Sequence, residues 1–138
     1  MSQSAILVVE DDVELRDALC AALASGDYPV LSAGDGVEAL ALLDSQPVGL
    51  VVSDVQMEPM NGHELLGHIR QRHPRLPAVL MTAYGTIENA VDAMQSGASD
   101  YLVKPFDARD LIAVVDRHIW DGASPDELVV ALGLDRTR

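Results

Sequence analysis

Charged and hydroxyl side chains follow four of the short apolar segments in this sequence. They are Glu10, Asp11, Asp12, Asp54, Thr82 and Lys104. Carboxylates that converge need a compensating cation, and oxygen ligands of this kind select a hard ion, most readily Mg2+ with retained waters. A carboxylate beside such a cation is ionised and nucleophilic, while the metal, an ammonium and a hydroxyl group bind and neutralise phosphoryl oxygens. These residue types predict phosphoryl transfer, provided that the fold brings them together.

The apolar segments read as five strands, each followed by a stretch with helical periodicity. The expected strands are Ala5–Val9, Val30–Ala33, Leu50–Ser53, Ala78–Met81 and Tyr101–Val103. Continuous apolar strands that alternate with amphipathic helices predict an α/β fold, a doubly wound five-stranded parallel sheet with helices on both faces. The carboxyl ends of such strands share one edge of the sheet, so the reactive side chains should meet there. Asp12 directly precedes a helical stretch and is expected to cap it.

Length, composition and charge narrow the class of protein. The 138 residues are one domain's length, and a net charge of −13 opposes direct binding of nucleic acid. The chain has a single cysteine, lacks an apolar run of the roughly 20 residues that span a membrane and does not begin like a signal peptide, which favours a cytoplasmic protein. Ser124-Pro-Asp-Glu127 predicts a short extra C-terminal helix. We expect one domain over residues 1–121 and a C-terminal extension or linker over residues 122–138.

Four motifs resemble those of the receiver domains of two-component response regulators. They are Ile6-Leu-Val-Val-Glu-Asp-Asp12, Asp54 with Met57 and Gly62 after it, Met81-Thr-Ala-Tyr-Gly85 and Asp100-Tyr-Leu-Val-Lys-Pro-Phe106. They occur in order at the expected strand ends, and the resemblance covers about residues 4–119. It implies the flavodoxin-like receiver fold and a signalling switch that catalyses its own phosphorylation, rather than an enzyme that turns over a metabolite.

The resemblance also implies roles for the acidic residues. A sensor histidine kinase would donate its phosphoryl group to Asp54. Mg2+ would be held by Asp11, Asp54 and the backbone carbonyl of Gln56, with Glu10 acting through water and Asp12 outside the pocket.

Other roles implied by the resemblance concern the response to the phosphoryl group. Thr82 and Lys104 would bind it, Tyr101 would be the aromatic switch that packs inward, and Lys104-Pro105 would be a cis peptide. Gln56 and Tyr84 would flank the water that hydrolyses the acyl phosphate. Because a tyrosine ring excludes water and no general base is evident nearby, we expect the phosphorylated form to persist.

Within the family, residues 82–106 are most similar to receivers of NtrC-type, sigma-54-dependent activators, including flagellar regulators. Those proteins continue into ATPase and DNA-binding domains. No GxxxxGK[ST] motif occurs in this chain, so it is either a receiver cut from a longer regulator or a stand-alone regulator. Phosphorylation is implied to change the face formed by the helix around Ile87–Met94, the strand Tyr101–Val103 and the helix after Pro105. That face would contact a second copy of the chain or an output domain and so control transcription.

One departure from the family lies in the loop after the acceptor. Glu58 stands where the family usually has proline, and Pro59 follows it. We expect a slightly different loop path and an additional negative charge near the metal.

Two other functions stay open. A haloacid-dehalogenase-type phosphatase also uses a strand-end aspartate and Mg2+, but it needs a second aspartate where this chain has Gln56. A receiver-like interaction module would never be phosphorylated.

The pattern Gly34–Ala39 fits a dinucleotide fingerprint but follows the second strand instead of the first. His63 and His68 resemble a zinc protease motif. Their spacing, however, places them about 140° apart on a helix, so they cannot bind the same metal ion.

Overall fold

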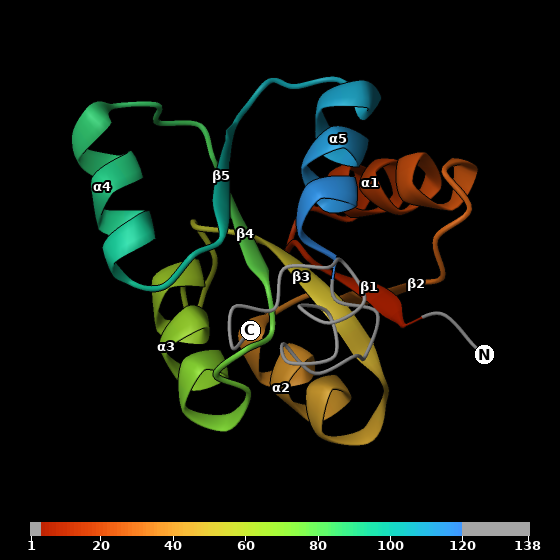
Figure 1. The fold of residues 1–138 in the computed structure, drawn as a ribbon, viewed down its shortest axis with the longest axis horizontal. Helices are drawn as coiled ribbons and strands as arrows, with labels where there is room; N and C mark the ends of the chain where they lie inside the picture. The colour runs from red at the N-terminus through yellow and green to blue at the C-terminus, as the bar shows by residue number, and fades with distance from the viewer. Residues whose placement is uncertain (1–3, 120–138) are drawn as a thin grey trace, which may run out of the picture.

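The predicted alternation of strands and helices is present over residues 4–119, the part of the chain that a computed structural model describes. The strands are β1 (Ala5–Val9), β2 (Val30–Ala33), β3 (Val48–Asp54), β4 (Ala78–Thr82) and β5 (Asp100–Val103), and the helices are α1 (Val13–Ser25), α2 (Gly36–Ser45), α3 (Gly62–Arg72), α4 (Ile87–Gln95) and α5 (Ala108–His118). All pairs of strands are parallel, in the order β2-β1-β3-β4-β5 (Figure 1). The doubly wound α/β fold is confirmed. The expected C-terminal helix after Ser124 and the domain boundary at residue 121 lie outside the described residues.

Helices cover both faces of the sheet, with α1 and α5 on one face and α2, α3 and α4 on the other (Figure 1). Alternate side chains of β1 divide between two hydrophobic cores: Ile6 and Val8 pack with α1 and α5, whereas Leu7 and Val9 pack with α2 and α3. The central strands β1 and β3 are therefore buried on both faces, which explains their unbroken apolar sequence. The five helices within residues 4–119 all lack the length and apolar character that a membrane crossing requires.

Each helix begins at a polar side chain that caps its first turn. The capping residues, each accepting a hydrogen bond from a backbone N–H three residues on, are Asp12, Asp35, Asn61, Thr86 and Asp107. The predicted cap at Asp12 is confirmed. The carboxylate of Asp35 caps the start of α2, where the pyrophosphate of a dinucleotide would have to bind. The glycine pattern Gly34–Ala39 therefore marks the start of a helix and not a dinucleotide site. Because the helices begin soon after the strands end, the strand-end side chains are held between rigid elements.

Candidate functional site

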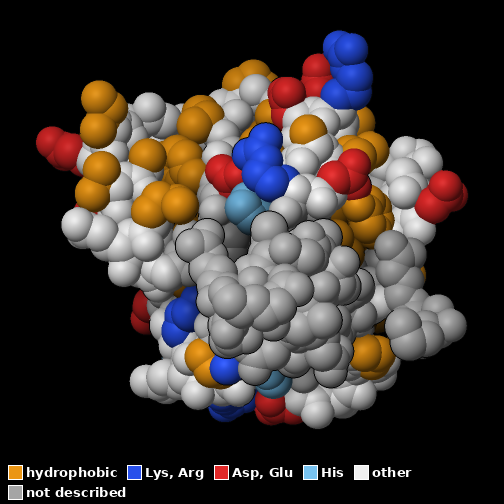
Figure 2. All heavy atoms as spheres, viewed as in Figure 1, with side chains coloured by type: hydrophobic (Ala, Val, Ile, Leu, Met, Phe, Trp, Pro, Cys, Tyr) orange, Lys and Arg blue, Asp and Glu red, His pale blue; other side chains and the backbone are white. Residues whose placement is uncertain are grey.

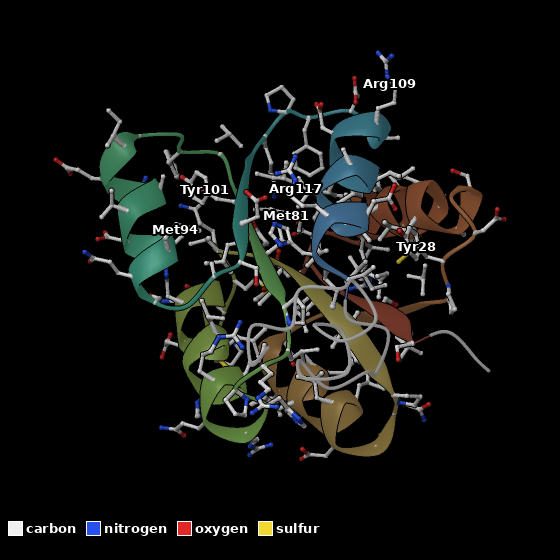
Figure 3. All side chains as sticks on the ribbon, viewed as in Figure 1. Tyr28, Met81, Met94, Tyr101, Arg109 and Arg117 are labelled. Atoms are coloured by element: carbon white, nitrogen blue, oxygen red, sulfur yellow. The ribbon has the colours of Figure 1, made fainter. Side chains whose placement is uncertain are left out.

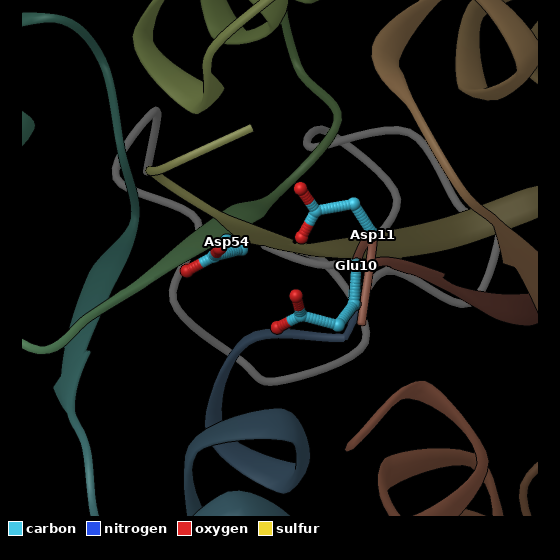
Figure 4. Close-up of side chains that lie close together, drawn as sticks. All are labelled: Glu10, Asp11 and Asp54. Atoms are coloured by element: carbon cyan, nitrogen blue, oxygen red, sulfur yellow. The ribbon is translucent and has the colours of Figure 1, made fainter. Parts of the chain in front are cut away.

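The carboxyl edge of the sheet brings three acidic side chains together (Figure 4). Glu10 and Asp11 follow β1, and Asp54 ends the neighbouring strand β3. One oxygen atom from each of the three carboxylates lies within 4.8 Å of the other two. Glu10 and Asp54 are buried, whereas Asp11 is exposed. Within residues 4–119 no other set of three such ligands comes this close, and hard oxygen donors with one side open to solvent fit Mg2+ with retained waters.

Lys104 compensates the two buried carboxylates. Its Nζ atom lies 3.1 Å from Oε1 of Glu10 and 3.0 Å from Oδ1 of Asp54. Burial raises the pKa of Glu10, and the charge of Asp54 adds to that rise, whereas hydrogen bonds from the Asp12 N–H and from Lys104 oppose it. Burial alone would lower the pKa of Lys104, but its hydrogen bonds to Asp54 and Glu10 outweigh burial and raise that pKa. The lysine is therefore a protonated ammonium at neutral pH, within reach of any group attached to Asp54.

Gly62 holds the following helix against the strand that carries Asp54. Its N–H donates a hydrogen bond to the carbonyl oxygen of Val55 at 2.8 Å. A Cβ atom at this position would lie only 2.4 Å from the carbonyl oxygen of Asp54. Only glycine lets α3 begin this close to β3, so Gly62 fixes the path of the loop between them.

The loop between β3 and α3 contains the expected departure. The Glu58–Pro59 peptide is cis, as is the Lys104–Pro105 peptide, which confirms the expectation at the second position. Glu58 lines an open hollow of about 330 Å3 together with Asp11, Gln56 and Met57. The additional negative charge is therefore on the same side of the edge as the exposed carboxylate of Asp11.

Thr82 and Tyr101 are linked through the backbone of Tyr84. The Tyr84 N–H donates to Oγ1 of Thr82 at 3.1 Å, which leaves the hydroxyl proton of Thr82 free to be donated elsewhere. Tyr101, between β5 and α4 in Figure 3, donates its hydroxyl proton to the Tyr84 carbonyl oxygen at 2.6 Å. The side chain of Asn89 donates to the same oxygen at 3.1 Å. The residue expected to act as a switch is thus joined to the buried hydroxyl at the end of β4 by two hydrogen bonds.

Two residues that lie near the site were not assigned to it from the sequence. Arg16 donates from Nη1 to the carbonyl oxygen of Glu10 at 3.0 Å and lies so close to Gly34 that a Cβ there would be 2.9 Å from Nη1. It therefore holds the backbone that presents the acidic pair. The sequence did contain an indication of this role, because Arg16 lies one helical turn after Asp12. The other residue is His63, which lines a hollow of about 120 Å3 beside Thr82.

The outer side of α4 and β5 carries exposed apolar side chains. Ile87 is 84% exposed, and Val91, Met94 and Val103 are each between 41% and 50% exposed. Figure 2 shows hydrophobic side chains gathered over α4. Exposed apolar groups that cluster in this way are typical of a surface that contacts another protein.

Comparison with known proteins identifies the family and the relatives of this chain. Residues 6–116 match the family described as response regulator receiver domain. The chain is 50% identical over 113 residues to the response regulator protein FleR of Pseudomonas aeruginosa and 42% identical over 119 residues to the DNA-binding transcriptional regulator NtrC of Salmonella typhimurium. These matches cover 82% and 86% of this chain but 24% and 25% of the two relatives. The chain thus spans about a quarter of the length of the curated relatives it matches.

Solved structures show the same architecture. The chemotaxis protein CheY4 of Vibrio cholerae superposes with a TM-score of 0.81 at 28% identity, covering 86% of this chain and all of that one (100%). The receiver domain of NtrX from Brucella abortus superposes with a TM-score of 0.76 at 39% identity, covering 82% of this chain and 96% of that one.

Proposed function

Because this chain belongs to the response regulator receiver domain family, we propose that it is the cytoplasmic phospho-acceptor of a two-component system, to which a sensor histidine kinase transfers a phosphoryl group at Asp54. The proposal rests on the two kinds of neighbour that surround Asp54. Its carboxylate is part of the acidic cluster and also accepts a hydrogen bond from the ammonium of Lys104 at 3.0 Å. A carboxylate so compensated is available as a nucleophile in a place where cations can bind the phosphoryl oxygens.

The transfer is a displacement at phosphorus. An oxygen of Asp54 attacks the phosphorus of the phosphohistidine, the P–N bond breaks, and its electron pair stays on the imidazole nitrogen. The hydroxyl group of Thr82 and the ammonium of Lys104 donate hydrogen bonds to the phosphoryl oxygens of the product. Thr82 ends β4, which neighbours β3, and Lys104 follows β5, the next strand in the sheet. When bound, Mg2+ supplies neutralisation of the phosphoryl charge. Its protein ligands are proposed to be Asp11, Asp54, the backbone carbonyl of Gln56 and, through water, Glu10.

The consequence of phosphorylation is proposed to reach the face made of α4, β5 and α5. A phosphoryl group that draws Thr82 toward it displaces the Tyr84 backbone, and the Tyr84 carbonyl is bonded to the hydroxyl of Tyr101 on β5. The exposed apolar side chains of α4 are available to a second copy of the chain or to ATPase and DNA-binding output domains in a longer regulator. One relative is named as a DNA-binding transcriptional regulator, which supports control of transcription as the output.

Small-molecule phosphorylation tests the proposal. Incubation with acetyl phosphate and Mg2+ should add one phosphoryl group to the intact protein by mass spectrometry, and chelation of the metal should prevent it. Asp54→Ala should remain unlabelled, whereas Asp35→Ala, which removes an aspartate that caps α2, should be labelled normally. Labelling of Asp54→Ala to the wild-type extent would contradict the proposal.

A further inference from the structure

A small hollow adjoins the end of β4, between the starts of α3 and α4. Its volume is about 120 Å3, and its lining includes Thr82, Gln56, Tyr84 and His63. A hollow of this size with hydroxyl, amide and imidazole groups in its wall can hold several water molecules. Gln56 also lines the open hollow beside Asp11, so this residue lies between the two hollows.

His63 reaches this hollow because of how α3 begins. The residue follows Gly62, whose close packing on the carbonyl oxygen of Asp54 brings the first turn of the helix to the end of β3. His63 is half-buried there. Two of the other histidines differ in their surroundings: His68, five residues along the same helix, is exposed, and His118 is paired with Asp100 at 2.9 Å.

The wall of the hollow includes both residues expected to flank the water that hydrolyses an acyl phosphate. Gln56 can orient a water molecule through its amide but cannot take up a proton at neutral pH. Tyr84 is 55% exposed, so it lies at the rim of the hollow, where its ring can limit the entry of water but cannot take up a proton at neutral pH. An imidazole, in contrast, has a nitrogen lone pair that can accept a proton from water when the ring is neutral.

On the basis of the proposed function, we propose that His63 is the general base for hydrolysis of the acyl phosphate at Asp54. A water molecule in the hollow is held by the imidazole and attacks the phosphorus. The bond from the water oxygen to phosphorus forms while the bond from phosphorus to the Asp54 oxygen breaks, and its electron pair returns to the carboxylate. The water proton passes to His63 and then to solvent, and inorganic phosphate leaves. The lifetime of the signal then depends on the imidazole.

The decay of phosphorylated protein tests this assignment. Wild-type, His63→Ala, His63→Gln and His68→Ala proteins are phosphorylated with acetyl phosphate and Mg2+, freed of the donor and followed by intact mass. We expect about ten-fold slower decay in both His63 variants, below the usual range for a general base because Gln56 still orients water. His68→Ala, the matched control on the same helix, should decay like wild type.

Added imidazole separates proton transfer from packing. It should accelerate decay of His63→Ala, where the side chain leaves space, by a larger factor than it accelerates decay of wild type. Wild-type decay rates in both His63 variants would overturn the proposal, and so would a wild-type rate in His63→Gln alone, because that side chain can hold a water but not take its proton. Slow decay of His63→Ala without any response to imidazole would also overturn it. If the proposed function itself fails, wild type acquires no label. If only the role of His63 fails, all the proteins are labelled and decay at the same rate.

Discussion

Replacing Asp11 by alanine should stabilise the metal-free protein, because it relieves repulsion among three carboxylates. Their nearest oxygens lie within 4.8 Å of one another. At that separation two unit charges repel by about 0.9 kcal/mol in a water-like medium and about 3.5 kcal/mol at an effective dielectric constant of about 20. Asp11 is exposed, so the lower figure applies to each of its two pairs. Attraction to Lys104 offsets part of that sum, which leaves an expected gain of about 1 kcal/mol.

Urea denaturation in the presence of a chelator measures this gain. The free energy of unfolding should rise by about 1 kcal/mol in Asp11→Ala, equivalent to about 3 °C in melting temperature for a domain of this size. Asp11→Asn keeps the shape and removes the charge, so it should give a similar gain. Asp17→Ala, which removes an exposed acid on α1, should change stability by less than about 0.5 kcal/mol.

Magnesium should reverse the order of stability. Wild type should be stabilised in proportion to the logarithm of the metal concentration, whereas Asp11→Ala should respond little. A clear loss of stability in Asp11→Ala and Asp11→Asn without metal would contradict this prediction, because it would mean that the carboxylate makes a stabilising contact in the folded protein.

Three further predictions concern other groups of the site. Lys104→Met should lower the free energy of unfolding in chelator by about 3 kcal/mol, because it leaves two buried carboxylates uncompensated; an unchanged urea midpoint would contradict this. The pKa of Glu10 is raised above its ordinary value of 4.5, so its contribution to stability is present below that value and lost as pH rises through the folded pKa. Between neutral pH and pH 5, metal-free wild type should therefore gain stability relative to Glu10→Gln, and a parallel pH dependence of the two proteins would argue against it. Tyr84→Ala should hydrolyse its acyl phosphate several-fold faster, a change of roughly 1 kcal/mol in the barrier, and equal or slower decay without a phosphatase would show that the ring does not exclude water.

Local sequence features were sufficient to predict the fold and the strand-end residues. Unbroken apolar runs such as Leu50–Ser53 identified the buried strands, and a parallel sheet then required their carboxyl ends to meet. The cap at Asp12 followed from its place before a helical stretch, and the structure confirms it. These predictions succeeded because each depends on hydrophobic period or on neighbours within one helical turn.

Contacts between elements that are distant in the sequence could not be predicted from these local features. The hydrogen bond from Arg16 to the Glu10 carbonyl depends on the direction in which α1 leaves the sheet. The place of His63 depends on the close approach of Gly62 to Asp54, and the bond between Tyr101 and the Tyr84 carbonyl joins residues 17 positions apart. Each is set by how whole elements pack, which the local pattern of the sequence does not contain.

Locating the phosphoryl group on the chain shows whether Asp54 accepts it. After reaction with Mg2+ and phosphoramidate, a small donor with a P–N bond, the acyl phosphate is reduced with borohydride and the protein is digested for peptide mass spectrometry. The reduced product is expected at Asp54, with Glu10 and Asp11 unmodified. A reduced product at either of those two carboxylates, or none at Asp54 in protein that carries the label, would contradict it.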